Sequence, residues 1–124
     1  MWIFTRYGFY SVACAQSPNG SVDSETMMVR ARRLAHLQNL QQRFATLANT
    51  EILTLRTRDY RYRLIVQKAV WISIISELAK EQEWSNFKNE AARYQGASGK
   101  DYVEALHEVW AVMNGLQKSE RRFH

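Results

Sequence analysis

The 124 residues are enough for one domain with a hydrophobic core and too few for two domains of typical length. Hydrophobic residues make up 46% of the chain and charged residues 23%, which excludes a disordered protein. Cys14 is the single cysteine, so an internal disulfide is excluded and a reducing compartment is favoured.

Targeting segments are not expected. Arg6 and Gly8 interrupt the apolar start of the chain, so its hydrophobic stretch is too short for a signal peptide. No stretch approaches the roughly 20 apolar residues that a membrane span requires. We therefore expect a cytoplasmic protein with no membrane partner.

The formal net charge of +5 lies entirely in the first half of the chain. Residues 1–63 contain nine arginines, no lysine and four acidic residues, whereas residues 64–124 contain eight basic and eight acidic residues. A guanidinium group makes planar, bidentate hydrogen bonds and stacks on rings, which suits phosphates and carboxylates. An anionic partner is therefore favoured, either nucleic acid or an acidic protein, with nucleic acid preferred.

The first elements are predicted to form a hairpin. Residues 9–14 are aromatic and β-branched enough for a strand, and residues 17–21 contain Pro18, Asn19 and Gly20, which favour a turn. Residues 27–32 then alternate small or apolar with charged side chains, which is typical of a half-buried strand.

A helix and a second hairpin are predicted to follow. Apolar residues recur at intervals of three and four from residue 33 and predict a helix: Leu34, Leu37, Leu40, Phe44 and Leu47. Residues 51–56 and 60–66 have strand composition, and the polar residues 57–59 between them are few enough to close a hairpin.

The rest of the chain is predicted to be helical. Three further apolar stripes at helical spacing lie over residues 70–78, 84–94 and 102–116, with a break at residues 95–99, and Asp101 is expected to cap the last helix. We expect one domain over 1–124, with strands and one helix in 1–66, helices in 67–118 and a frayed tail in 119–124.

This order of elements predicts an α+β protein. We expect an antiparallel sheet of about four strands with amphipathic helices on one face, as a variant of the ferredoxin-like βαββα plan. The usual closing strand is missing, and the strand over residues 9–14 is expected to take an edge in its place.

Several short motifs are distributed along the chain. They are Met1-Trp2-Ile3-Phe4-Thr5 with Gly8-Phe9-Tyr10-Ser11, Val29-Arg30-Ala31-Arg32, Asp59-Tyr60-Arg61-Tyr62-Arg63, Asn86-Phe87-Lys88 and His107-Glu108-Val109-Trp110. As a set they resemble a widespread family of small uncharacterised bacterial proteins. The resemblance covers most of the chain and implies a bacterial origin, and no function comes with it.

The strand arginines are the main candidate site. Side chains two residues apart on a strand share a face, which pairs Arg30 with Arg32 and Arg61 with Arg63. The opposite face of the last strand, Tyr60, Tyr62, Leu64 and Val66, is expected to meet the helices. The predicted anion-binding residues are Arg30, Arg32, Arg56, Arg58, Arg61 and Arg63, with stacking surfaces supplied by Tyr7, Phe9 or Tyr10.

The alternative for these arginines is structural. On a solvated sheet face their aliphatic stems would pack on neighbouring side chains, and their charged heads would pair with Glu25, Glu51 or Asp59.

Other chemistry is poorly supported. Glu104 and His107 have the spacing of half a dimetal site, but a second such pair is missing. We expect His107 and Glu108 to lie on the polar face opposite Trp110 or to pair with a neighbouring element. No spacing brings Cys14 to a histidine, and no phosphate loop surrounds the glycines of residues 95–99. No metal or cofactor is predicted, and a non-enzymatic binding module is favoured over an enzyme.

A different class of function follows from the helices. Three amphipathic helices have more apolar surface than one small sheet is expected to cover, so part of this surface is expected to remain exposed. The alternative function is therefore protein–protein interaction, as a homodimer or as a subunit of a bacterial assembly.

Overall fold

Residues 1–121 are described by a computed structural model, in which five strands form one antiparallel sheet and the second half is helical. The chain divides into two compact units, Met1–Glu83 and Trp84–His124. The first unit holds the whole sheet, and the α+β class with a helical second half is confirmed. The single domain over 1–124 stays a prediction.

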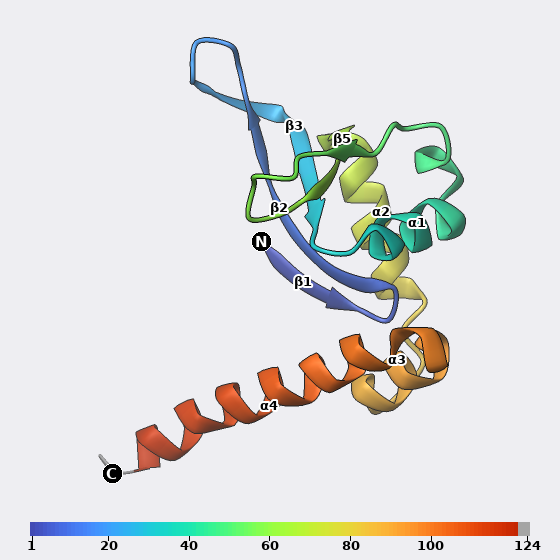
Figure 1. The fold of residues 1–124 in the computed structure, drawn as a ribbon, viewed down its shortest axis with the longest axis vertical. Helices are drawn as coiled ribbons and strands as arrows, with labels where there is room; N and C mark the ends of the chain where they lie inside the picture. Colours follow the sequence, from blue (N-terminus) through green and yellow to red (C-terminus); the bar gives the residue numbers. More distant parts are fainter. Residues whose placement is uncertain (122–124) are drawn as a thin grey trace. The chain divides into compact units, whose positions relative to one another are not determined.

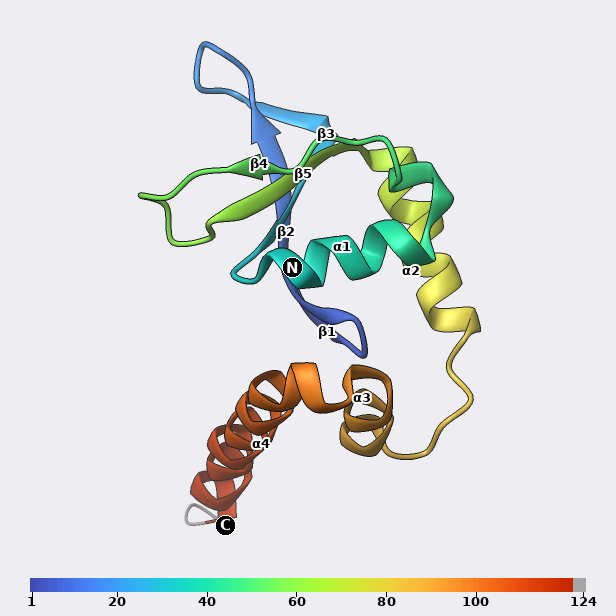
Figure 2. The same ribbon diagram turned by 45° about the vertical axis from the view of Figure 1, so that its right-hand side comes forward.

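The sheet has the strand order β1-β2-β3-β5-β4, and every neighbouring pair is antiparallel (Figures 1 and 2). The strands are β1 (Trp2–Thr5), β2 (Gly8–Gln16), β3 (Val22–Ala31), β4 (Leu53–Thr54) and β5 (Tyr62–Gln67). Both predicted hairpins form, and β1 is one strand more than the four expected.

The ferredoxin-like βαββα order is found in β3, α1 (Leu34–Arg43), β4, β5 and α2 (Lys68–Lys80). Because β5 lies between β3 and β4 and is antiparallel to both, β3 and β4 run in the same direction and are connected through α1. β2 takes the place of the missing closing strand beside β3. The prediction that β2 forms an edge of the sheet is wrong, because β1 pairs with its other side.

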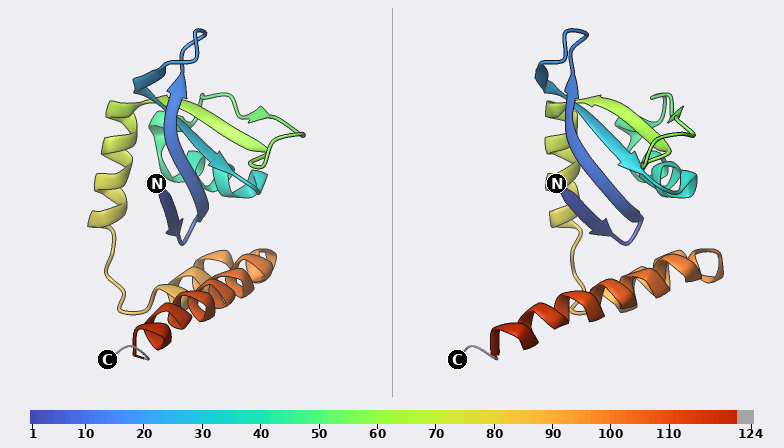
Figure 3. Two further views of the ribbon diagram at one scale, coloured as in Figure 1. Left: turned by 90° about the vertical axis from the view of Figure 1, so that its left-hand side faces the viewer. Right: turned by 60° about the vertical axis from the view of Figure 1, so that its left-hand side comes forward.

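Helices α1 and α2 cover one face of the sheet. In the left view of Figure 3 the sheet lies in front of these two helices. Alternate residues of β2, β3 and β5 point into this layer. The core contains Tyr10, Val12, Val29, Ala31, Leu64 and Val66 from the strands and Leu37, Leu40, Trp71 and Ile74 from the helices. Burial of these apolar side chains is the main stabilising term of the first unit.

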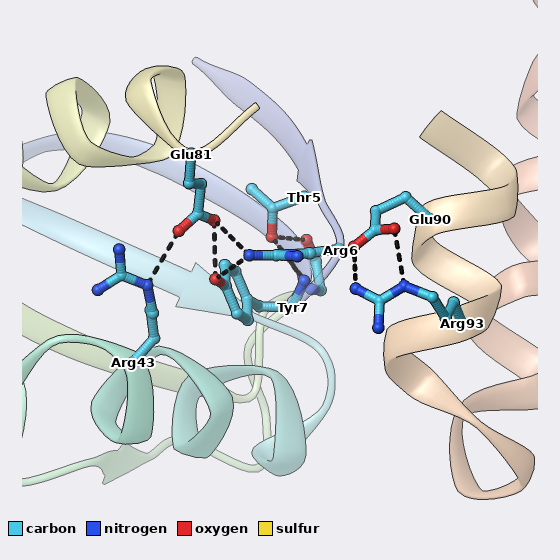
Figure 4. Close-up of polar contacts among 8 residues, drawn as sticks. Thr5, Arg6, Tyr7, Arg43, Glu81, Glu90 and Arg93 are labelled. Atoms are coloured by element: carbon cyan, nitrogen blue, oxygen red, sulfur yellow. Dashed lines mark hydrogen bonds and ion pairs between the residues drawn. The ribbon is translucent and has the colours of Figure 1, made fainter. Parts of the chain in front are cut away.

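A partly buried carboxylate connects three elements at one end of this core (Figure 4). Glu81, directly after α2, accepts hydrogen bonds from the Tyr7 hydroxyl (2.7 Å) and from Arg43 Nε (2.9 Å). Arg6 adds an ion pair at 3.4 Å. These contacts join the end of α2 to the β1–β2 turn and to the last turn of α1.

The second unit contains α3 (Phe87–Gln95) and α4 (Lys100–Arg121), which pack against each other. The Asn86 side chain caps α3 by accepting from the Asn89 N–H group (2.9 Å). Asp101 lies inside the first turn of α4, so its predicted role as the cap is wrong.

The last helix is longer than predicted. Helix α4 continues through Arg121, so residues 119–121 of the predicted frayed tail are helical. Residues 122–124 of that tail lie outside the described residues. None of the helices in residues 1–121 combines the length and the apolar character needed to cross a membrane.

Candidate anion-binding face

Arg30 and Arg63 lie on the face of the sheet opposite α1 and α2, which we call the outer face. The two residues are direct partners in the β3–β5 register, and Arg30 is also the partner of Ser11 on β2. Residues directly across an antiparallel pair share a face. Their strand neighbours Val29 and Leu64 are fully buried in the core, so the arginines point to the other side.

The two guanidinium groups have different surroundings. Arg30 donates to the Ser11 carbonyl oxygen (3.3 Å) and to the Ser11 hydroxyl (2.9 Å), which fixes its position. The Nε atom of Arg63 is buried without a hydrogen-bond partner, and its Nη1 lies 3.4 Å from the Met28 sulfur, a weak acceptor. Burial lowers the pKa of Arg63 from its usual value, and the charges of Arg30 and Arg58 lower it further.

A cavity of about 800 Å³ lies on the outer face, between the β2–β3 hairpin and the loop that connects β4 to β5. Arg30, Arg58 and Arg63 line it together with Tyr60 and Asp59. Among residues 1–121, none of these three arginines forms an ion pair with a carboxylate. The lining of the cavity therefore contains three arginines and two carboxylates, Asp59 and Asp23, which leaves an excess of positive charge.

Four aromatic residues form a row on the outer face, here called the aromatic row: Trp2, Phe4, Phe9 and Tyr60. The Phe9 ring stacks on Phe4 at 4.6 Å between ring centroids, and it meets Trp2 edge-on at 6.0 Å. At its other side Phe9 lies 6.4 Å from the Tyr60 ring. Trp2 is 71% exposed and Phe4 is 37% exposed, whereas Phe9 is half-buried and Tyr60 is only 7% exposed, so the row offers flat apolar surface to solvent at its β1 end.

Tyr60 joins the aromatic row to the arginines. The guanidinium of Arg32 lies 4.3 Å from the Tyr60 ring centroid and that of Arg30 lies 5.0 Å away, which is cation–π distance. We expected Tyr60 on the helix side, and this prediction is wrong. Strand β5 begins only at Tyr62, so the alternation of strand faces does not extend to Tyr60.

The structure separates the six predicted arginines into three groups. Arg30, Arg58 and Arg63 line the cavity. Arg32 pairs with Asp59 at 3.3 Å beside it, as the structural alternative expected. Arg56 and Arg61 are exposed on the β4–β5 loop and do not line the cavity, and the alternation expected to pair Arg61 with Arg63 stops before β5.

The three predicted stacking residues do not lie on one face of the sheet. Phe9 lies on the outer face, whereas Tyr7 and Tyr10 are buried in the core, where Tyr10 donates to the His36 carbonyl oxygen (2.6 Å). Sequence reasoning missed Trp2 and Phe4, because residues 2–5 were not predicted to form a strand. The alternation of Trp2 and Phe4 with Ile3 and Thr5 is the signal that was available.

The remaining candidate residues contact other side chains of the protein. The Cys14 sulfur lies 4.0 Å from the Met27 sulfur. His107 stacks on Trp110, at 6.1 Å between ring centroids, so it lies beside this ring and not opposite it. The other expectation, a contact with a neighbouring element, is met by Lys88 of α3, whose Nζ lies 3.4 Å from His107 Nδ1. Within the described part of the chain, no three His, Cys, Asp or Glu side chains are grouped closely enough to bind a metal ion.

Fold and outer face together define a ferredoxin-like α+β unit with a basic and aromatic sheet surface. No protein-family model, curated protein or solved structure matches this chain. The resemblance to a family of small bacterial proteins therefore stays a prediction.

Proposed function

We propose that this protein is a non-enzymatic binding module that holds single-stranded nucleic acid on the outer face of its sheet. The observation that supports this most strongly is the position of the aromatic row beside the arginines of the cavity, with Tyr60 belonging to both. Single-strand binding sites combine rings on which bases stack with cations that follow the phosphate backbone. The proposal places the protein in the cytoplasm, where Cys14 remains a thiol.

The aromatic row favours nucleic acid over an acidic protein. Carboxylate side chains pair with cations and do not stack on aromatic rings, whereas every base has a face that stacks on an aromatic side chain. Trp2 and Phe4 are such rings, placed on edge strand β1 and exposed.

Single strands are favoured over duplexes for a related reason. In a duplex the faces of the bases are stacked on one another, so they cannot reach rings on a sheet without being unstacked. Bases of a single strand can be laid open on the aromatic row while their phosphates reach Arg58 or Arg63.

The test is binding of internally labelled single-stranded RNA, single-stranded DNA and duplex of one sequence, measured by fluorescence anisotropy at low salt. We expect both single strands to bind more tightly than the duplex. The double variant Trp2→Ala/Phe4→Ala should lower the single-strand affinity by about 5- to 100-fold per stacked base. Ile72→Ala is the matched control, because Ile72 is 60% exposed and lies on α2, on the opposite side of the sheet. Absence of single-strand binding at low salt would contradict the proposal.

A second candidate function is supported by α4. Along this helix, Val109, Trp110, Val112, Met113 and Leu116 are exposed, which leaves an apolar stripe at helical spacing. This stripe suits a homodimer or a subunit of a larger assembly. The double variant Val112→Glu/Met113→Glu should convert a dimer to a monomer in sedimentation experiments, and a wild-type protein that is monomeric at high concentration would exclude the homodimer.

A further inference from the structure

The cavity has a surplus of positive charge. Arg32 neutralises Asp59, which leaves Asp23 as the other carboxylate at the wall against Arg30, Arg58 and Arg63. The charges of Arg30 and Arg58 both act on Arg63. An arrangement of like charges around a partly buried guanidinium costs free energy unless an anion completes it.

The unmatched hydrogen-bonding capacity lies at Arg63. Its Nε–H group is buried and has no acceptor, although a buried donor normally has one. Arg30 is different, because Ser11 holds it with two hydrogen bonds. Because the Nε atom of Arg63 has almost no exposed surface, an anion would bind instead to the terminal guanidinium nitrogens of Arg63 and Arg58, and its charge would offset the repulsion between the arginines.

The amount of charge distinguishes between kinds of phosphate. A phosphodiester within a strand carries one negative charge, whereas a phosphate monoester carries about −1.5 to −2 at neutral pH and three acceptor oxygens. Three arginines facing one unmatched carboxylate fit the monoester better than the diester.

The rest of the cavity fits the organic part of a nucleotide. Its volume of about 800 Å³ is within the range of small-molecule sites, which is about 300–1,000 Å³. Beside the arginines it is lined by Met28 and Ile65, which offer apolar surface, and by the polar side chains of Gln16 and Thr26. The aromatic row ends at Tyr60 in the cavity wall, so a strand that lies on Trp2 and Phe4 and follows the row leads to the cavity.

We propose that this cavity binds the phosphate monoester of a nucleotide, supplied by the phosphorylated end of a nucleic acid strand or by a free mononucleotide. Arg58 and Arg63 contact the phosphate oxygens, and Arg30 adds charge from a position fixed by Ser11. The base or sugar lies against Met28 and Ile65. The strand-end source rests on the proposed function, and the free mononucleotide does not.

The experiment compares internally labelled oligonucleotides of one sequence with a 5′-phosphate, a 3′-phosphate or two hydroxyl ends. One phosphorylated end is expected to bind about 10- to 100-fold more tightly than the hydroxyl ends, as for added hydrogen bonds between charged groups. Adenosine monophosphate, adenosine and inorganic phosphate, titrated calorimetrically, test the free-nucleotide source. Adenosine monophosphate should bind, and adenosine should not.

Variants connect the effect to the cavity. Arg63→Met should remove the preference for the phosphorylated end, and Arg63→Lys, which keeps the charge and loses the planar fork, should restore only part of it. Arg61→Met is the matched control, because Arg61 is exposed and does not line the cavity. Arg58→Met provides a second variant on the loop in case the strand substitution disturbs folding, which thermal unfolding reports.

The outcomes are distinguishable. Equal affinity for all three oligonucleotides, together with no binding of adenosine monophosphate, overturns the inference and leaves the proposed function standing. Binding of adenosine monophosphate without binding of any oligonucleotide supports the cavity as a mononucleotide site and excludes the single-strand function. A preference for phosphorylated ends that persists in Arg63→Met and in Arg58→Met also overturns the inference, because the phosphate is then bound elsewhere.

Discussion

Arg30 and Arg63 are direct cross-strand partners on β3 and β5, and neither forms an ion pair with any carboxylate of the described residues. Like charges directly opposite each other on a sheet are destabilising. The Nε–H group of Arg63 is also buried without an acceptor. The protein therefore carries an unfavourable arrangement at the position where we propose that an anion binds.

This relationship predicts that Arg63→Met does not destabilise the free protein. The substitution removes a repulsion and an unmatched donor while keeping most of the apolar stem, so the free energy of unfolding should stay equal or rise by about 1 kcal/mol. Urea denaturation at low salt measures this, with Arg61→Met as the control. A loss of 2 kcal/mol or more would mean that Arg63 has a stabilising partner in the free protein.

Salt dependence predicts which arginines contact phosphate. For single strands, each neutralised phosphate contributes about −0.7 to the slope of log K against log salt concentration. Arg58→Met should therefore make the slope shallower by about 0.7, whereas Arg56→Met, on the same loop and outside the cavity, should leave the slope unchanged. Equal slopes for wild type and Arg58→Met would place the phosphate contacts on other residues.

Local patterns predicted the elements that are stabilised by their own periodicity. The alternation in β3 and β5 predicted the shared outer face of Arg30 and Arg63. The leucine spacing predicted α1 with Leu37 and Leu40 buried, although Leu34 is exposed and the helix ends at Arg43, before Phe44 and Leu47. These predictions hold because burial of one face determines the register of a strand or helix.

The predictions that failed depend on contacts distant in sequence or on loop geometry. Strand β1 has only four residues and is held by pairing with β2, aided by the hydrogen bond from the Met1 amino group to the Val12 carbonyl oxygen (2.7 Å). Tyr60 lies in the β4–β5 loop, which is closed by a hydrogen bond from the Leu55 N–H group to the Arg61 carbonyl oxygen (2.7 Å), and its ring lies against Phe9 and Arg32 of the outer face. The composition of residues 55–61 does not specify this loop geometry.

Replacement of Gly8, at the β1–β2 turn, is expected to lower the stability of the protein strongly. Its φ angle of +154° is one that residues with a side chain rarely adopt, and a Cβ atom there would collide with the ring of His36 on α1. Gly8→Ala should lower the free energy of unfolding by about 3 kcal/mol or more. Gly20→Ala, where φ is +85° with open space around it, should cost only about 1 kcal/mol for backbone strain. Similar losses for the two variants would contradict the predicted collision.

The hydrogen bond between Tyr7 and Glu81 predicts how stability changes in alkaline solution. Burial raises the pKa of the Tyr7 hydroxyl above its ordinary value of 10.0, and the hydrogen bond to Glu81 raises it further. The unfolded chain therefore releases this proton at lower pH than the folded protein does. The contribution of Tyr7 is fully present below the ordinary tyrosine pKa, near 10, and is lost as the pH rises through the higher folded pKa.

Tyr7→Phe tests this contribution. At neutral pH the variant should be less stable by about 1–2 kcal/mol, because Glu81 loses one of its donors while Arg43 and Arg6 remain. Urea denaturation from about pH 8 to 11 should show the wild-type free energy of unfolding falling more steeply above pH 10 than that of the variant. The difference between the two proteins should therefore narrow with rising pH, and a constant difference would mean that the proton of Tyr7 is held equally in both states.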